Sequence, residues 1–401
     1  MHVLYIPSWY PAKVGDTNGS FFREQAQAMS AAGTRVGVIT PAFRSFSSIQ
    51  ALTSGSFGIH QENDLGIPTL RLHGVRAFSW NHALNMRFWE HKGIQAYENY
   101  ACQHGKPDIL HVHGMIYGLA WASAIKQKYG VPFVVTEHSS EFALANIRPK
   151  LLAYLQEQVQ HASRLFAVSR DLGRRLTSTV TPPSHLAWNT MPNLVNTNFG
   201  SRVPNRKANP LPGRLNLLTV GVLQPKKGHA KLLLALKEVI DAGVDVGLRI
   251  CGGGPEHKPL QQLIQKLGLK DRVALLGNCE RETVMDEMAA CDAFILSSDY
   301  ETFGIVVIEA LASGKPVIAP RCGGPEDVID PGKDGFLVPN NSPIELAAGI
   351  QRMAHEVQYF KAADLRARCI ARYSAAAFVQ RHELVYDSVV NSKGGLAPLE
   401  S

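Results

Sequence analysis

Two carboxylates and a glycine between residues 301 and 309 give this sequence its clearest potential for chemistry. Glu301 follows an apolar run, Gly304 permits a tight turn, and Glu309 lies in a second apolar run with helical spacing. A helix that starts near Gly304 presents N–H groups without internal partners, which bind anions such as phosphate. Eight residues of helix span about 12 Å, so the two carboxylates cannot contact one atom. They can instead hold two parts of one extended ligand that carries phosphate between them.

Two further candidate side chains lie at the ends of predicted strands. Lys227 follows the first apolar strand of the second half of the chain, where a cation can neutralise a departing diphosphate. His138 ends another predicted strand, and its imidazole can donate a hydrogen bond to a sugar hydroxyl or phosphate, or act as an acid or base. The plain alternatives are a lysine without function and a structural histidine, which is the role we expect for His111 and His113.

A glycine ends the first predicted loop. Asn18-Gly19 stands directly before a helical pattern, and a glycine there lets the backbone approach a ligand closely. An ordinary turn followed by a helix cap is the alternative. We therefore treat Gly19 as a candidate ligand contact.

The sequence carries no signature of a metal or cofactor site. The six cysteines stand at positions 102, 251, 279, 291, 322 and 369, and none belongs to a Cys-x-x-Cys pair. No Asp-x-Asp triplet is present to bridge a divalent cation to a diphosphate, and no P-loop motif occurs. We therefore expect no metal, no cofactor and a reducing, cytosolic compartment.

Short apolar runs alternate with helical patterns in the first half of the chain, which predicts a parallel, doubly wound α/β sheet. The expected strands are His2–Pro7, Arg35–Thr40, Asp108–His113, Val131–His138 and Arg164–Ser169. The expected helices are Ser20–Ala32, Ile116–Tyr129, Leu151–Ala162 and Asp171–Leu176.

The same alternation restarts in the second half and predicts a second parallel α/β sheet. The expected strands are Leu215–Val222, Leu248–Cys251, Val273–Leu276, Ala293–Ser297, Pro316–Ala319 and Gly335–Pro339. The expected helices are His229–Ile240, Glu256–Leu267, Arg281–Ala290, Gly304–Ala312 and Pro343–Val357, followed by two more at about 361–372 and 375–391.

The chain is long enough for two domains, because 401 residues exceed one ordinary hydrophobic core. Residues 192–214 are rich in proline and polar residues and have no periodicity, so they are the expected linker. Ligands of open α/β sheets bind outside the carboxyl ends of the strands. We therefore expect the site in a cleft between two Rossmann-like halves.

The order of these loops resembles the family 4 retaining glycosyltransferases of GT-B architecture, of the type that assembles bacterial polysaccharides and lipid-linked glycans. The resemblance covers nearly the whole chain, and its strongest element is Glu301-Thr-Phe-Gly304 with Glu309. The other matching motifs are Val220-Gly-Val-Leu-Gln-Pro-Lys-Lys-Gly228, Leu276-Gly-Asn278, Gly323-Gly-Pro-Glu326, Asp334-Gly-Phe-Leu-Val338 and Pro192-Asn193.

The resemblance implies a role for each candidate residue. Glu301 would contact the donor sugar, Glu309 would bind the ribose hydroxyls, and His138 would lie near the reacting sugar carbon. The implied catalytic residues are Glu301, His138 and Lys227, without a metal. The implied donor-binding residues are Gly19, Lys227, Gly277, Asn278, Glu301, Phe303, Gly304, Ile305 and Glu309.

The resemblance also implies how the domains divide the work. Residues 1–195 would form an acceptor-binding domain, joined by the C-terminal helix at about 375–391, which carries Tyr386. Residues 196–374 would form the nucleotide-sugar-binding domain. The sequence departs from the family at Val222, where an arginine that binds phosphate is usual, so Lys227 and the helix start would carry more of the phosphate charge.

The implied activity is a retaining, metal-independent hexosyltransferase. It would move a sugar from a UDP- or GDP-linked donor to a glycan or polyprenyl-linked acceptor in cell-surface polysaccharide or lipopolysaccharide synthesis. Two alternatives stay open: a nucleotide-sugar epimerase or hydrolase of the same architecture, and a non-catalytic nucleotide-sugar-binding protein. No feature indicates nucleic acid as a partner.

The positive charge of the chain is concentrated in its first half. The whole chain carries +7, and residues 1–195 contain 17 Lys and Arg against 11 Asp and Glu, which is +6. Residues 76–92 mix aromatic and basic side chains, which suits either contact with an anionic membrane or a helix packed on its own domain. No apolar run approaches the ~20 residues that span a bilayer. We expect a cytoplasmic protein, or one peripheral on the inner face of the plasma membrane.

Overall fold

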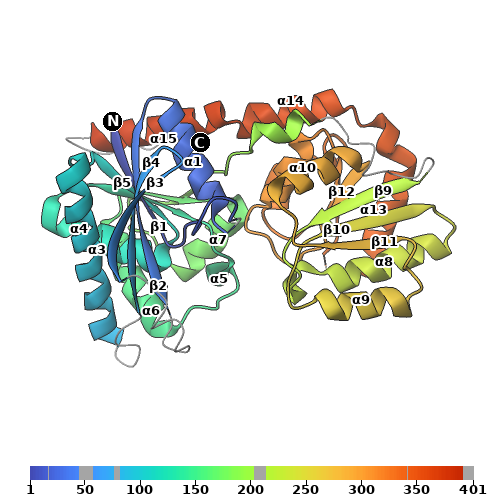
Figure 1. The fold of residues 1–401 in the computed structure, drawn as a ribbon, viewed down its shortest axis with the longest axis horizontal. Coiled ribbons are helices and arrows are strands. Elements are labelled where there is room, and N and C mark those ends of the chain that lie inside the picture. The colour runs from blue at the N-terminus through green and yellow to red at the C-terminus, as the bar shows by residue number, and fades with distance from the viewer. Residues whose placement is uncertain (17, 45–56, 76–81, 203–213, 341, 392–401) are drawn as a thin grey trace. The chain divides into compact units, whose positions relative to one another are not determined.

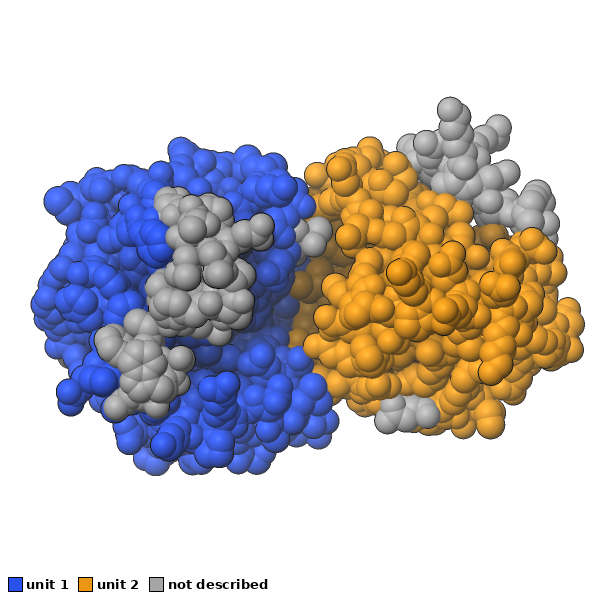
Figure 2. Space-filling view, turned by 60° about the horizontal axis from the view of Figure 1, so that its bottom comes forward, with its two compact units in different colours: residues 1–194, 375–401 blue, residues 195–374 orange. Residues whose placement is uncertain are grey.

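The computed structural model describes residues 1–401 except 17, 45–56, 76–81, 203–213, 341 and 392–401. The chain forms two compact units, which Figure 2 colours separately. Unit 1 comprises Met1–Leu194 with Ala375–Ser401, and unit 2 comprises Val195–Ser374. Each unit is an α/β domain built on its own sheet, which confirms the predicted fold class.

The described residues of unit 1 form an eight-stranded sheet in the order β3-β4-β2-β1-β5-β6-β7-β8. The central strands carry continuous apolar runs because both faces of the sheet are covered. The strands are β1 (His2–Pro7), β2 (Arg35–Arg44), β3 (Gly58–Asp64), β4 (Ile67–Val75), β5 (Ile109–His113), β6 (Phe133–Glu137), β7 (Arg164–Ala167) and β8 (Trp188–Thr190).

The β3–β4 pair adds an antiparallel edge to the predicted parallel sheet. β3 runs antiparallel to β4, and Leu65 and Gly66 connect them with φ values of 52° and 94°. Two positive φ values in a two-residue loop are typical of a hairpin turn that matches the strand twist. β3 is an exposed edge strand, so its sequence lacks the apolar pattern from which strands were predicted. β4 and β8 were not predicted either.

The helices of unit 1 pack on both faces of its sheet. Figure 1 shows α3 beside α4. Gly93 of α3 lets the Trp121 ring of α4 approach closely, because a Cβ at Gly93 would lie 2.4 Å from Trp121 Cγ. α1 and α15 share a core with residues of β1 such as Tyr5. The helices are α1 (Ser20–Ala31), α3 (His82–His104), α4 (Met115–Tyr129), α5 (Ser140–Ala143), α6 (Pro149–Gln158), α7 (Arg170–Thr179) and α15 (Ala375–Val390).

Part of the aromatic and basic segment predicted at 76–92 lies outside the described residues. Its remainder, from His82, begins α3. Met86 and Trp89 are buried, whereas Leu84 is 43% exposed. Packing on its own domain therefore explains two of these side chains, and membrane contact stays a prediction. Among the described residues, no helix combines the length and apolar character needed to cross a membrane.

Unit 2 contains a six-stranded, wholly parallel sheet in the order β11-β10-β9-β12-β13-β14. The chain adds strands on one side of β9 and then on the other, so the order reverses between β9 and β12. Such a reversal opens a crevice at the carboxyl ends of the two strands, where open α/β sheets bind ligands. The strands are β9 (Leu215–Val220), β10 (Val246–Cys251), β11 (Val273–Gly277), β12 (Ala293–Ile295), β13 (Val317–Pro320) and β14 (Gly335–Val338).

The helices of unit 2 that were predicted lie within one or two residues of their expected bounds, and several of them have a clear apolar face or cap. Ser342, for example, caps α13 by accepting a hydrogen bond from the Glu345 N–H. The short α12 was not predicted. The helices are α8 (His229–Asp241), α9 (His257–Lys266), α10 (Arg281–Ala290), α11 (Ile305–Ala312), α12 (Pro325–Val328), α13 (Pro343–Glu356) and α14 (Ala362–Tyr373).

Candidate functional site

An ion pair joins the loops that follow β9 and β12 in unit 2. Lys227 Nζ lies 2.6 Å from Glu301 Oε1, and Ser298 Oγ donates to the same oxygen at 2.7 Å. The side chains of Lys227 and Glu301 are 25% and 13% exposed. The fold thus brings together two candidate residues 74 positions apart in the sequence, at the crevice where the strand order reverses.

Gly228 makes this approach possible. It adopts a φ of 66°, and a Cβ at this position would lie 2.1 Å from the Ser297 carbonyl oxygen. Ser297 Oγ also donates to the Lys227 carbonyl at 2.8 Å, and the Asp299 N–H donates to the Lys226 carbonyl at 2.9 Å. These backbone contacts hold the lysine loop against the loop that carries Glu301.

A third loop, after β13, supports Glu301 from its other side. The Glu301 N–H donates to the Cys322 carbonyl, and the Gly324 N–H donates back to the Glu301 carbonyl, at 2.9 and 2.8 Å. A Cβ at Gly324 would lie only 2.3 Å from Phe303 Cα. Phe303 is 2% exposed and its ring lies edge-on to Tyr373, so the ring is not available to a ligand.

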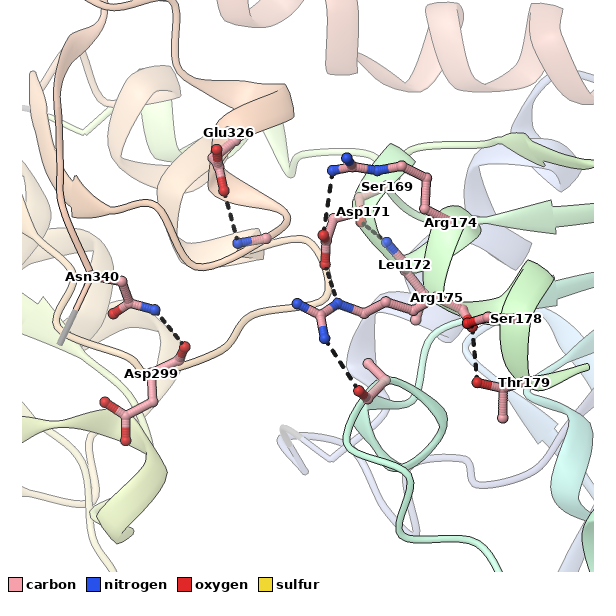
Figure 3. Close-up of polar contacts among 12 residues, drawn as sticks. Ser169, Asp171, Leu172, Arg174, Arg175, Ser178, Thr179, Asp299, Glu326 and Asn340 are labelled. Atoms are coloured by element: carbon pink, nitrogen blue, oxygen red, sulfur yellow. Dashed lines mark hydrogen bonds and ion pairs between the residues drawn. The ribbon is translucent and has the colours of Figure 1, made fainter.

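Polar contacts at the margin of the site fix the same loops. Figure 3 shows Asn340 donating to the Asp299 carbonyl at 2.8 Å, and Glu326 accepting the Gly323 N–H at 3.3 Å. Lys231 pairs with the Asp299 carboxylate at 2.8 Å. The loop that bears Glu301 is therefore held at several points before any ligand arrives.

The helix start predicted near Gly304 is present. Gly304 caps α11 with a φ of 89°, and the Val307 N–H bonds its carbonyl at 2.9 Å. The first N–H groups of the helix, at Ile305 and Val306, have no partner within the helix and can receive an anion. Glu309 lies further along α11, where its carboxylate is 3.4 Å from Arg281 Nη2. The two carboxylates thus occupy different places, as their spacing requires.

Glycines allow the loops after β10 and β11 to pack closely against each other and against the loop after β9. Gly277 ends β11 with a φ of 72°. The Asn278 side chain lies over Gly253, where a Cβ would meet its Oδ1 at 2.2 Å. A Cβ at Gly252 would come within 1.9 Å of the Gly221 carbonyl. Asn278 is therefore held in place by the neighbouring loop.

One cation usual in the resembling family is absent from the loop after β9, as the sequence indicated. Val222 is 52% exposed and contributes no charge where the family usually has arginine. Arg321 lies 3.4 Å from Glu326, which partly neutralises it. Lys227 remains the cation in direct contact with a candidate carboxylate of this loop.

His138 lies in unit 1, directly after β6. Its Nε2 is 3.3 Å from Nδ1 of His113, and the rings of Phe21 and Phe22 pack against it with centroids 5.4 and 4.9 Å away. Burial lowers the pKa of His138 to about 3. The imidazole is therefore neutral near pH 7, which favours a hydrogen-bonding role over that of a base.

Glu137 is a functional candidate that the sequence reasoning did not assign. Its buried carboxylate accepts hydrogen bonds from the N–H groups of Met115, His138 and Ser139 at 2.7–2.8 Å. Burial raises the pKa of Glu137 to about 7, while these three bonds favour its ionised form. Glu137 ties the start of α4 to the loop that carries His138. The sequence feature that could have identified Glu137 is a carboxylate at the end of an apolar strand.

His111 takes the structural role expected of it. Its Nδ1 lies 2.6 Å from the Tyr386 hydroxyl of α15, and its Nε2 lies 2.8 Å from Thr136 Oγ1. Burial lowers the pKa of His111 and of His113 well below the usual histidine value. The C-terminal helix is thereby anchored to the centre of the unit 1 sheet.

Unit 1 also contains the candidate residue Gly19 and a set of ion pairs on α7. Gly19 caps α1 with a φ of 78°, and a Cβ there would lie 3.0 Å from the Trp9 ring. On α7, Asp171 pairs with Arg174 and Arg175 at 3.4 and 2.7 Å, as Figure 3 shows. The structure thus places Gly19 and His138 in unit 1, and the other candidate residues in unit 2.

In the part of the chain that the structure describes, no group of three or more His, Cys, Asp or Glu side chains is arranged to hold a metal ion.

Comparison with known proteins identifies the family of this chain. The model of family 4 glycosyltransferases matches residues 19–198, and the model of glycosyl transferases group 1 matches residues 202–372. The two matches together span most of both units. The chain therefore belongs to the family 4 glycosyltransferases, an enzyme class that the sequence predicted.

Relatives in this class act in several pathways. The chain is 25% identical to N-acetyl-alpha-D-glucosaminyl L-malate synthase of Bacillus anthracis, over 71% of this chain and 75% of the relative. It is 29% identical to D-inositol 3-phosphate glycosyltransferase of Thermobispora bispora, over 70% and 71% of the two chains. It is 37% identical to the lipopolysaccharide core biosynthesis glycosyltransferase LpsD of Rhizobium meliloti, over 33% and 37%.

Solved structures show the same fold. Sucrose-phosphate synthase from Thermosynechococcus elongatus superposes with a TM-score of 0.78 at 22% identity, over 98% of this chain and all of that one. HepE of Anabaena, solved in complex with UDP and glucose, superposes with a TM-score of 0.73 at 20% identity, over 97% of this chain and all of that one. Both support the GT-B architecture that the sequence predicted.

Proposed function

We propose that this glycosyltransferase is a retaining, metal-independent hexosyltransferase. It uses a UDP- or GDP-linked sugar and modifies a glycan or polyprenyl-linked acceptor in cell-surface polysaccharide or lipopolysaccharide synthesis. The observation that carries the proposal is the Lys227–Glu301 pair beside the start of α11. The complex of HepE with UDP and glucose supports a nucleotide-sugar donor, and LpsD supports a role in lipopolysaccharide synthesis.

The donor diphosphate would bind at the start of α11. The N–H groups of Ile305 and Val306 and the ammonium of Lys227 supply positive charge on either side of the same loop. Glu309 would accept hydrogen bonds from the ribose hydroxyls. Its neighbour Arg281, 3.4 Å away, holds the carboxylate in place until the nucleotide arrives.

The donor sugar would bind at Glu301. Within the described residues, both hydrogen bonds to this carboxylate go to Oε1, one from Lys227 and one from Ser298. Oε2 is therefore available to a sugar hydroxyl. Glu301 orients the sugar in this scheme and forms no covalent bond to it.

Glycosyl transfer separates charge, and the site is arranged to stabilise both signs. As the bond to the diphosphate breaks, positive charge grows on the sugar and negative charge on the leaving group. Lys227 and the N-terminus of α11 stabilise the diphosphate, and the Glu301 carboxylate lies on the side of the sugar. The same diphosphate can take the acceptor proton, so front-face attack with retention needs no protein base.

His138 fits this scheme as a neutral hydrogen-bonding group. Its lowered pKa, about 3, makes a protonated form costly, and its Nε2 is directed to His113. The imidazole would contact the sugar or acceptor without gaining a proton. Its loop is fixed by Glu137, through the His138 and Ser139 N–H groups.

The acceptor would bind unit 1, and its polyprenyl carrier would bring the enzyme to an anionic membrane. The excess positive charge of residues 1–195 supports this location. Flotation with vesicles of anionic and of neutral lipid tests it: binding to the anionic vesicles is expected. Absence from both kinds of vesicle would remove the membrane from the proposal.

A donor screen tests the central activity. UDP- and GDP-linked hexoses are added to the wild type and to Glu301→Gln, thermal stabilisation is measured, and products are analysed with and without lipid-linked acceptors. We expect one donor class to stabilise the wild type and to transfer its sugar only when acceptor is present. Free sugar released without acceptor would indicate the epimerase or hydrolase alternative, and binding without turnover would indicate a non-catalytic protein.

A further inference from the structure

A polar cavity in unit 2 lies away from the candidate donor site. It occurs at the amino ends of β9, β10 and β11, which Figure 1 shows side by side, whereas the donor loops follow their carboxyl ends. Its volume is about 170 Å³. The lining residues are Arg214, Asn216, Leu217, Gly247, Leu248, Arg249, Lys270, Asp271, Arg272, Val273 and Ala274.

One face of the sheet forms the floor of this cavity. Gly247 pairs with Asn216, and Arg249 pairs with Ala274, so these four residues lie on the same face. Gly247 has no side chain, and the Arg214 side chain fills the hollow that this leaves. A Cβ at this position would lie 3.1 Å from Arg214 Cδ and 3.8 Å from Arg214 Nη1, so the guanidinium of Arg214 lies over the hollow.

The lining carries more cations than carboxylates. Four cations, Arg214, Arg249, Lys270 and Arg272, contribute to it, against one carboxylate, Asp271. Guanidinium groups match the oxygen atoms of phosphate and remain charged at any physiological pH. The lining is thus suited to a small anion.

Carboxylates that do not line the cavity hold its arginines in place. Asp245 accepts from Arg214 Nε at 2.9 Å and also from Arg272 Nη1. Glu287 of α10 accepts from Arg249 through both Nε and Nη2, at 2.5 and 2.6 Å. These bonds fix the side chains but use only some of the five N–H donors that each arginine carries.

Donors therefore remain available to a ligand. Among the residues that the structure describes, Arg214 hydrogen-bonds through Nε alone, and Lys270 forms no hydrogen bond or ion pair. Because Arg214 Nη1 lies over the hollow at Gly247, at least one unused donor group stands at the cavity floor.

We propose that this cavity binds a small anion with two phosphate groups, of the size of inorganic pyrophosphate. A volume near 170 Å³ is roughly ten times what one water molecule requires, which leaves room for a diphosphate. The site is separate from the donor site, and it does not depend on the function proposed above.

Calorimetric titration with inorganic pyrophosphate tests the proposal. The full chain is used in a Lys227→Ala background, which removes the cation of the donor site. Lys270→Gln and Lys266→Gln form a matched pair, because both lysines are exposed and only Lys270 lines the cavity. We expect one saturable site, at least threefold weaker in Lys270→Gln and unchanged in Lys266→Gln.

Gly247→Val supplies a second, steric test. Valine suits a strand, but its side chain would displace the Arg214 side chain from the cavity floor, so binding should weaken by more than tenfold. Unfolding temperatures establish that each variant is folded. Absence of saturable binding in the parent protein, or equal binding by Lys270→Gln and Lys266→Gln, overturns the proposal even if Gly247→Val fails to fold.

Discussion

Replacement of Lys227 by methionine separates catalysis from stability at the proposed donor site. The variant keeps the aliphatic length of the side chain and removes its charge. At an effective dielectric constant of about 20, a unit charge 4 Å away contributes roughly 4 kcal/mol. Loss of one such group from a preorganised site costs about 10²–10³ in kcat. We therefore expect kcat to fall by that factor.

The same variant should remain folded. The Lys227 side chain is 25% exposed, and Glu301 keeps its hydrogen bond from Ser298 at 2.7 Å. Partly exposed ion pairs contribute little, so the free energy of unfolding should change by less than about 1 kcal/mol. Lys237→Met is the matched control, because Lys237 pairs with Asp241 on α8. Initial rates and urea unfolding measure the two quantities.

One result would refute this reasoning. If Lys227→Met transfers sugar within threefold of the wild-type rate while its unfolding is unchanged, the ion pair plays no part in stabilising the leaving group. A large loss of stability with a matching loss of activity would also contradict it, because the lysine would then act through the fold.

Three other predictions concern the glycine beside the ion pair, the missing arginine and the buried histidines. Gly228→Ala should destabilise the protein more than Gly243→Ala does in urea unfolding, and it should also lower activity. Both glycines have positive φ, but only a Cβ at Gly228 would meet backbone, at 2.1 Å. Equal effects of the two substitutions would contradict the packing argument. Val222→Arg should raise kcat/KM for the donor by up to about tenfold, because it adds a phosphate-binding cation at an exposed position, and an unchanged or lower value would place this loop away from the phosphates. The free energy of unfolding should fall as pH drops from about 7 to about 5, because burial lowers the pKa of four histidines whose unfolded forms bind protons in this range: His111, His113, His138 and His382. The raised pKa of Glu137 acts in the opposite direction, but it is one group against four. Urea unfolding that does not depend on pH would contradict the assignment.

Much of the fold could be predicted because its sheets are buried on both faces. Strands such as His2–Pro7 and Phe133–Glu137 appear as short apolar runs, and the helices between them have clear periodicity. β3 could not be predicted in this way, because its side chains are mostly exposed and its register depends on the turn at Leu65 and Gly66. β8 has only three residues, too few to show a pattern.

The site could be predicted in part for a similar reason. The spacing of Glu301, Gly304 and Glu309 is local, so one loop and one helix determine it. The contact between Lys227 and Glu301 depends on the order of strands in the sheet and on the close approach at Gly228. Of the three hydrogen bonds to Glu137, those from the His138 and Ser139 N–H groups are local. The one from Met115 depends on the packing of α4 beside β6, which no local pattern encodes.

The anomeric configuration of the product tests the central claim most directly. The donor that stabilises the protein most in the thermal screen is supplied with a lipid-linked acceptor, and the new linkage is analysed by NMR spectroscopy, with Glu301→Gln as the comparison. We expect a product with the configuration of the donor, formed by the wild type and lost in Glu301→Gln. An inverted linkage, or a product formed equally well by Glu301→Gln, would contradict it.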